Sequence, residues 1–251
     1  MTHNRFTIGL MVVLGWFLVS ADSAADTIRI AVASNFAKTI KPIVTQFEKD
    51  TVHQVLVALG STGKHYAQIQ HGARFDIFLA ADVRRPLLLE QSNKAVPGSR
   101  FTYAIGKLVL WSRHPGLIEK DSAVLETNGF DRLAIANPKL APYGKAARQV
   151  LQSLGIWEKL KPRTVRGENI GQTFQFVMTG NAQLGFVALS QVIALNSNES
   201  RDYWVVDKTL YDPIDQQAVL LVDTPAARAF IDYLESAQAR AMIVQSGYDV
   251  P

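Results

Sequence analysis

After its first 25 residues the chain repeats one local pattern: a short run of β-branched residues, a turn of small polar residues, and an amphipathic helical segment. The first unit has alternating apolar residues at 28–32, a turn at 33–35, and apolar residues with helical spacing between Phe36 and Phe47. Strands that alternate with helices are typical of parallel sheets covered by helices on both faces. The sequence therefore predicts an α/β fold.

Further strands and helices follow in the same order along the chain. Expected strands lie at 55–59, 75–80, 133–136, 164–165 and 184–187, with longer β-rich runs at 101–111 and 217–222. Thr224 and Pro225 are typical of the start of a helix near the C-terminus. Within the first helix, Pro42 either kinks the helix or confines its regular part to the residues after it.

Residues 1–25 have the features of a secretory signal peptide. Arg5 supplies a positive charge, residues 6–19 are apolar, and the small residues 23–25 form a cleavage site before Asp26. A membrane anchor is the alternative, but the apolar stretch is short for a bilayer span. We therefore expect cleavage and a periplasmic location. A lipoprotein is excluded because the chain has no cysteine to carry the lipid.

The mature chain contains no linker rich in proline, glycine or serine that would divide it into two consecutive domains. The simplest topology joins residues 26–104 and 217–251 in domain I and inserts residues 105–216 as domain II. The chain then crosses twice between the domains. We therefore expect a cleft between the two domains.

Composition excludes several classes of function. With no cysteine, the chain has no disulfide, thiolate zinc site, iron–sulfur cluster or cysteine nucleophile. The net charge of +4 is small, and the basic residues are scattered without interleaved aromatic residues, so nucleic-acid binding is not expected. No two histidines have the i, i+4 spacing of a helical metal site, so a catalytic metal is not expected either.

Four turns between strands and helices carry hydroxyls, amides and bare backbone N–H groups. Ligands of open α/β sheets bind at such turns, outside the carboxyl ends of the strands. The turns are Ser34-Asn35, Gly60-Ser61-Thr62-Gly63, Tyr143-Gly144 and Asn169-Ile170-Gly171. Ordinary helix capping explains any one of them. Because they recur in both halves, and because a helix N-terminus attracts negative charge, together they predict an anion site.

Other readings of these turns fit less well. The segment Gly60–Lys64 resembles a phosphate loop but has two residues, not four, between its glycines. A secreted serine hydrolase that uses Ser61 and His65 stays a distant alternative, although Ser61 is not in a nucleophile elbow. Asp76 and Asp82 flank a strand and are expected to be structural rather than a catalytic pair.

At these turns the sequence resembles the periplasmic molybdate-binding proteins that feed ABC importers. The resemblance extends over essentially all of the mature chain, through residues 33–36, 60–63, 75–82, 98–111, 141–144, 184–188 and 246–248. It implies a two-lobed periplasmic-binding-protein fold of type II, with parallel-rich sheets flanked by helices and the ligand in the interlobe cleft. It further implies a monomeric, non-enzymatic protein without a cofactor, whose partner is an inner-membrane ABC permease.

The resemblance also implies which residues of the first lobe bind the oxyanion. In that family one hydroxyl residue follows the first strand, and it matches Ser34, with Asn35 beside it. A second follows the second strand and matches Thr62, with Ser61 adjacent. No metal ion is expected to be coordinated directly by side chains, because molybdenum would bind as its oxyanion.

The opposite lobe is expected to supply backbone N–H groups, which map onto Tyr143 and Ile170. One branch of the family adds a tyrosine hydroxyl where this chain has Ala188. We expect the Asn35 amide to replace that tyrosine, as in the other branch. Whether the Ala188 backbone contributes is left open by the sequence.

The donor-only character of these residues agrees with the expected ligand. Molybdate and tungstate have only acceptor oxygens at neutral pH, so O–H and N–H donors satisfy them completely. Phosphate is mostly protonated, and its P–OH group would lack an acceptor, at a cost of about 1–3 kcal/mol. Sulfate passes the same test. A sulfate or other oxyanion receptor is therefore the alternative, which only pocket size can separate.

Overall fold

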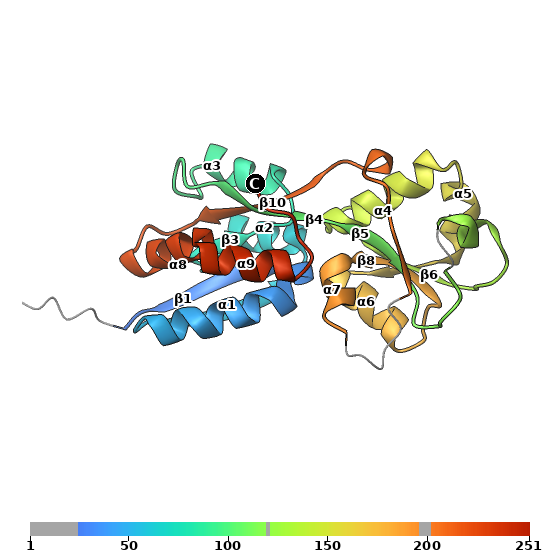
Figure 1. The fold of residues 1–251 in the computed structure, drawn as a ribbon. Coiled ribbons are helices and arrows are strands. Elements are labelled where there is room, and N and C mark those ends of the chain that lie inside the picture. Colours follow the sequence, from blue (N-terminus) through green and yellow to red (C-terminus); the bar gives the residue numbers. More distant parts are fainter. Residues whose placement is uncertain (1–24, 119–120, 196–201) are drawn as a thin grey trace, which may run out of the picture.

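The computed structural model describes residues 25–118, 121–195 and 202–251. The expected signal peptide, apart from Ala25, lies outside these residues. Two lobes lie side by side and are joined by extended strands (Figure 1). Each lobe has one sheet with helices on both faces, so the predicted fold class is confirmed. In the part of the chain that the structure describes, no helix is long and apolar enough to cross a membrane.

Lobe one is built on a five-stranded sheet with the order β2-β1-β3-β10-β4. The strands are β1 (Thr27–Ala33), β2 (Gln54–Gly60), β3 (Ile77–Leu79), β4 (Phe101–Gly106) and β10 (Ile214–Leu220). The helices are η1 (Ser34–Phe36), α1 (Ala37–Asp50), α2 (Thr62–Gln70), α3 (Arg84–Gln91), α8 (Pro225–Glu235) and α9 (Ala237–Gln245). Apolar residues of α1, α8 and α9 pack on one face of the sheet, and those of α2 and α3 pack on the other.

Lobe two is built on a second five-stranded sheet with the order β7-β6-β8-β5-β9. The strands are β5 (Leu108–Trp111), β6 (Leu133–Ala136), β7 (Thr164–Gly167), β8 (Leu184–Ala188) and β9 (Tyr203–Val205). The α-helices are α4 (Pro142–Ser153), α5 (Trp157–Leu160), α6 (Ile170–Met178) and α7 (Leu189–Ile193). Short 3-10 helices are η2 (Ala123–Glu126), η3 (Lys161–Arg163) and η4 (Lys208–Leu210). Helices α4 and α5 pack on one face of this sheet, and α6 and α7 on the other.

Both sheets are mixed. In each one, three neighbouring strands are parallel, a fourth pairs antiparallel with one of them, and the fifth pairs antiparallel with the fourth. The carboxyl ends of β1 and β2 therefore meet at one edge of the first sheet, as do those of β6 and β7 in the second. This arrangement turns the starts of η1, α2, α4 and α6 toward the boundary between the lobes.

The long β-rich run expected at 101–111 is two strands in two different sheets, β4 and β5, with Lys107 between them. The chain returns to lobe one along β10, which pairs antiparallel with β4 from Ile214 opposite Gly106. The domain limits expected at residues 104 and 217 fall inside these two strands. Strand β4 continues to Gly106 and β10 begins at Ile214, and the two stay paired up to the lobe boundary.

Local sequence explains the helix boundaries. Thr224 caps α8, since its Oγ1 accepts from the Ala227 N–H at 3.2 Å, and Pro225 takes the first helical position, as predicted. Helix α1 runs through Pro42 rather than beginning after it. Pro42 lies on the exposed face of α1, where water can solvate the carbonyl that loses its N–H partner.

Candidate functional site: a donor-lined pocket between the lobes

Six residues singled out in the sequence line one small pocket between the lobes: Ser34, Asn35, Ser61, Thr62, Tyr143 and Ile170. The other lining residues are Ala33, Gly60, Ala81, Ala141 and Pro142. Lobe one contributes η1 and the start of α2, and lobe two contributes the starts of α4 and α6. No charged side chain is among these described lining residues, so the polar groups at the pocket are hydroxyls, amides and backbone.

Helix α2 leaves one backbone N–H at the pocket. Its N-cap residue Ser61 accepts from the Lys64 N–H through Oγ at 3.3 Å. The Gly63 N–H donates across the boundary to the carbonyl oxygen of Leu140 at 2.8 Å. The Thr62 N–H lies in the first turn, where the helix itself provides no acceptor.

Helix α4 has the same arrangement at its start. Pro142 has no N–H, and the N–H groups of Gly144 and Lys145 both donate to the carbonyl oxygen of Ala141, at 2.9 and 3.1 Å. The Tyr143 N–H is the group in this first turn to which the helix gives no acceptor.

Helix α6 completes the set. Its N-cap residue Asn169 accepts from the Gln172 N–H through Oδ1 at 2.9 Å. The Gly171 N–H donates across the boundary to Ser34 Oγ at 3.2 Å. The Ile170 N–H is again left without an acceptor inside the helix.

Three helix N-termini thus converge on one pocket, and each has one first-turn N–H that neither its helix nor the lobe contacts described above use. These N–H groups belong to Thr62, Tyr143 and Ile170, all of which line the pocket. Each helix N-terminus carries a partial charge of about +0.5. The pocket is therefore suited to a small anion without any full positive charge.

The hydroxyls of lobe one add further donors. Thr62 Oγ1 accepts from the Ala81 N–H at 3.0 Å, and this contact fixes the side chain while leaving its own proton to donate. Ser61 Oγ likewise accepts as the cap of α2 and keeps its proton. Thr62 and Ser61 are both nearly fully buried, so neither hydroxyl rotates freely in solvent.

The Asn35 side chain is held by two hydrogen bonds in the described structure. Its Nδ2 donates to Gln216 Oε1 at 2.7 Å and to the Tyr248 hydroxyl at 3.0 Å, which uses both hydrogens. These partners lie in the buried core. Asn35 also lines the pocket, and the replacement of a tyrosine donor at position 188 by its amide stays a prediction.

Ala188 acts on the pocket only through a neighbour. Its N–H donates to Gln191 Oε1 at 3.0 Å, and Gln191 Nε2 donates to the carbonyl oxygen of Ile170 at 3.2 Å. Ala188 is not among the described residues that line the pocket. The Ala188 backbone is thus engaged in fixing the start of α6.

Ser61 and His65 do not form a catalytic pair. His65 Nε2 donates to the carbonyl oxygen of Val32 at 3.2 Å, and Nδ1 lies 3.1 Å from Gln68 Oε1. Burial lowers the pKa of His65, and the hydrogen bonds with Gln68 and Val32 oppose this effect. His65 therefore joins the end of β1 to the start of α2, on which Ser61 and Thr62 depend.

The two aspartates that flank β3 are structural, as expected. Asp76 Oδ2 accepts from the Arg29 N–H at 2.6 Å, and Asp82 Oδ1 accepts from the Arg85 N–H at 2.9 Å. Asp82 also forms an ion pair with the Arg85 guanidinium. Across residues 25–118, 121–195 and 202–251, no group of three or more His, Asp or Glu side chains is placed to hold a metal ion.

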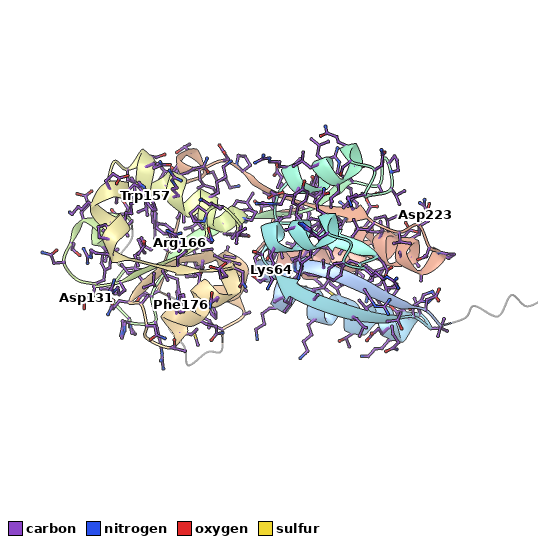
Figure 2. The ribbon with its side chains drawn as sticks, turned by 180° about the vertical axis from the view of Figure 1, so that it is seen from behind. Lys64, Asp131, Trp157, Arg166, Phe176 and Asp223 are labelled. Atoms are coloured by element: carbon purple, nitrogen blue, oxygen red, sulfur yellow. The ribbon has the colours of Figure 1, made fainter. Side chains whose placement is uncertain are left out.

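A larger cavity of about 380 Å³ opens beside the pocket and is lined by both lobes. Its charged lining residues are Asp82, Arg84, Arg85, Lys139, Lys145 and Asp212. Arg85 Nη2 donates to the carbonyl oxygen of Lys139 at 2.9 Å, which joins the lobes at this cavity. Lys64, exposed on lobe one, lies on the side facing lobe two (Figure 2). Basic groups thus outnumber acidic ones around the cavity.

A buried polar cluster behind the pocket was not predicted from the sequence. It includes Gln216, Tyr248 and Ser190, which contact Asn35. Burial raises the pKa of Tyr143 well above its ordinary value and raises that of Tyr248 to about 12, so both phenols stay neutral. One signal could have pointed to the cluster: Gln216 stands beside an apolar strand run, where a glutamine needs buried partners.

Comparison with known proteins agrees with this architecture. A model of the family described as bacterial extracellular solute-binding protein matches residues 28–249. The molybdate-binding protein ModA of Azotobacter vinelandii is 50% identical over 242 residues, which cover 95% of this chain and 96% of that protein. The molybdate-binding protein ModA of Rhodobacter capsulatus is 46% identical over 229 residues, covering 90% and 89%.

A solved structure supports the same assignment. The periplasmic molybdate-binding protein of Azotobacter vinelandii superposes with a TM-score of 0.85 at 41% identity, covering 89% of this chain and 99% of that one. The resemblance read from the sequence is therefore confirmed. By its matched length, its fold and these relatives, the chain belongs to the bacterial extracellular solute-binding protein family.

Proposed function

We propose that this protein binds molybdate in the periplasm and delivers it to an ABC importer of the inner membrane. The observation that carries the proposal is a donor-rich pocket without a carboxylate among its described lining residues, to which three helix N-termini from both lobes bring the N–H groups of Thr62, Tyr143 and Ile170. The two ModA relatives, named for molybdate binding, support the choice of ligand.

The chemistry of the pocket matches a fully deprotonated tetrahedral dianion. Molybdate oxygens only accept hydrogen bonds, and the pocket offers N–H groups together with the hydroxyls of Ser34, Ser61 and Thr62. Hydrogen bonds to a charged acceptor are stronger than neutral ones, and they gain further strength where water is excluded. Tungstate has the same charge and shape, so we extend the proposal to tungstate.

Binding would be coupled to closure of the lobes. In the described arrangement the lobes already contact each other through hydrogen bonds, from Gly63 to Leu140, from Gly171 to Ser34 and from Ser190 to Asn35. An anion held by donors from both walls adds to these contacts and favours the closed form by its differential affinity. The closed form is then the state that the permease recognises.

Titration calorimetry of the chain without residues 1–25 tests this proposal. Molybdate, tungstate, sulfate and phosphate are titrated separately into the same preparation. We expect molybdate and tungstate to bind more tightly than sulfate, and phosphate to bind most weakly because no carboxylate among the described lining residues accepts its proton. Tight binding of sulfate with weak binding of molybdate would favour the sulfate receptor instead.

A further inference from the structure

Gln216 is a fully buried amide on β10, the strand by which the chain returns from lobe two to lobe one. Its Oε1 accepts from Asn35 Nδ2 at 2.7 Å and from the Tyr103 hydroxyl at 3.2 Å. Its Nε2 lies 3.4 Å from the Tyr143 hydroxyl, to which it donates. A buried amide is costly unless such partners are present, so these three residues must stay together around Gln216.

The partners of Gln216 belong to the parts that form the pocket. Asn35 is in the wall of lobe one, and Tyr143 is in the wall of lobe two. Tyr103 is on β4, the other strand that crosses between the lobes. One side chain therefore connects both walls of the pocket with both crossing strands.

The crossing strand β4 leaves room for this arrangement through a glycine. A Cβ atom at Gly106 would lie 2.2 Å from the Tyr143 hydroxyl oxygen and 2.9 Å from Gln216 Nε2. The Tyr143 side chain is thus packed directly against both crossing strands, with its backbone N–H at the pocket. The contact with Gln216 limits how far the wall that carries Tyr143 can approach lobe one.

We propose that Gln216 is a positioning residue that sets the distance between the two walls of the pocket and thereby selects the larger oxyanions. This inference rests on the proposed function. Hydrogen-bond donors satisfy sulfate as well as molybdate, so only the spacing of the donors separates the two ions. Molybdate has longer bonds to oxygen than sulfate, and a fixed wider spacing therefore favours molybdate.

The test is the ratio of the molybdate and sulfate affinities, measured by calorimetry for the unaltered chain and for Gln216→Met. Methionine keeps the length of the side chain but makes none of the three hydrogen bonds. Because the walls then adjust to the smaller ion, we expect the ratio to fall by about tenfold or more, the usual scale of size discrimination. Thr62→Ala is expected to weaken both ions by similar factors, because its hydroxyl serves any acceptor oxygen.

Gln217→Met is the matched control on the same strand. Gln217 is only half-buried and contacts Arg100 and Thr102, away from the pocket. We expect it to keep the ratio of the unaltered chain. If Gln216→Met fails to fold, Tyr143→Phe decides the question, since it removes only the hydroxyl that Gln216 contacts; the ratio should then fall by about threefold.

An unchanged ratio in a folded Gln216→Met, or in Tyr143→Phe where that variant decides, would overturn the inference. An equal fall of the affinity ratio in Gln217→Met would overturn the inference as well, because the effect would then come from changing the strand and not from Gln216. If the unaltered chain does not bind molybdate, the proposed function itself fails. That result is seen in the same titration before any variant is compared.

Discussion

Ser34 and Gly171, which are 137 residues apart in the sequence, meet across the lobe boundary: the Gly171 N–H donates to Ser34 Oγ at 3.2 Å. The Ser34 hydroxyl in turn donates to Asn169 Oδ1 at 3.1 Å. The proton that links Ser34 to the start of α6 can rotate to an oxyanion oxygen at the same boundary. Ser34 thus joins the lobes, and we propose that it also donates to the ligand.

We expect Ser34→Ala and Thr62→Ala each to weaken molybdate binding by about 1–3 kcal/mol, since each removes a buried donor from a site with a charged acceptor. Tyr143→Phe should have a smaller effect, because the proposed donor is the Tyr143 backbone N–H, which the substitution keeps. Calorimetry gives the affinities, and thermal unfolding checks that the fold is retained. Wild-type affinity in both alanine variants would reject the assignment of the hydroxyls.

Gly106→Ala is expected to weaken molybdate binding by about tenfold or more, the scale of a disturbed buried contact. The new Cβ would lie 2.2 Å from the Tyr143 hydroxyl oxygen, which forces Tyr143 and its helix away from the pocket. Calorimetry measures the loss. Gly129→Ala is the control, because the nearest atom to its Cβ is the exposed Thr127 Oγ1, a side-chain atom at 3.2 Å.

A double variant checks the cause of that loss. Adding Tyr143→Phe to Gly106→Ala removes the atom in closest contact, so part of the affinity should return. If the double variant binds more weakly than Gly106→Ala alone, the clash with Tyr143 is not the cause.

The stability of the protein should depend on His65 at mildly acidic pH. Burial lowers the pKa of His65 in the folded state below the ordinary value of 6.5, so the unfolded chain binds the proton more readily. The contribution of His65 to the free energy of unfolding is fully present above pH 6.5, and it decreases as the pH falls through this value toward the folded-state pKa. We therefore expect the free energy of unfolding to fall between about pH 7.5 and about pH 5.5.

Urea unfolding at both pH values measures this difference. His65→Gln should reduce it, because a glutamine does not titrate. His114→Gln replaces an exposed histidine and should keep the difference of the unaltered chain. Identical pH dependence in all three proteins would contradict the role given to His65.

The cations around the outer cavity should affect how fast an anion binds. Arg84, Arg85, Lys139 and Lys145 line this cavity together with two aspartates, and none of the four lines the pocket itself. Such groups steer a charged ligand and act mainly on the association rate. We expect Arg84→Gln combined with Lys139→Gln to slow association several-fold at low salt while the dissociation rate stays unchanged.

Stopped-flow measurements of molybdate binding at two salt concentrations check this expectation. High salt should remove most of the difference between the variant and the unaltered chain, because exposed charges are screened. A change confined to the dissociation rate would mean that these residues contact the bound anion.

The residues at the helix starts were predictable, because small polar turns after β-branched runs indicate both the strand ends and the caps. Ser61, Tyr143 and Ile170 were found in this way, and the structure brings them to one pocket. The hydrogen-bond partners of the Asn35 side chain were not predictable. Its hydrogen-bond partner Gln216 is 181 residues away, and nothing local to Asn35 indicates which way its amide points.

The points where the chain crosses between the lobes were also only partly predictable from the sequence. The β-rich run 101–111 contains no turn of several polar residues, because Lys107 is the single residue between β4 and β5. Strands β4 and β5 belong to different sheets because β4 pairs with β10 and β5 pairs with β8, and both partners lie much later in the sequence.

A crystal structure of the protein with bound molybdate tests the central claim most directly. We expect the ion between the lobes, with its oxygens accepting from the backbone N–H groups of Thr62, Tyr143 and Ile170 and from hydroxyls of lobe one. No lysine or arginine side chain should contact it. An ion bound outside this pocket, or paired directly with a lysine or arginine, would contradict the account.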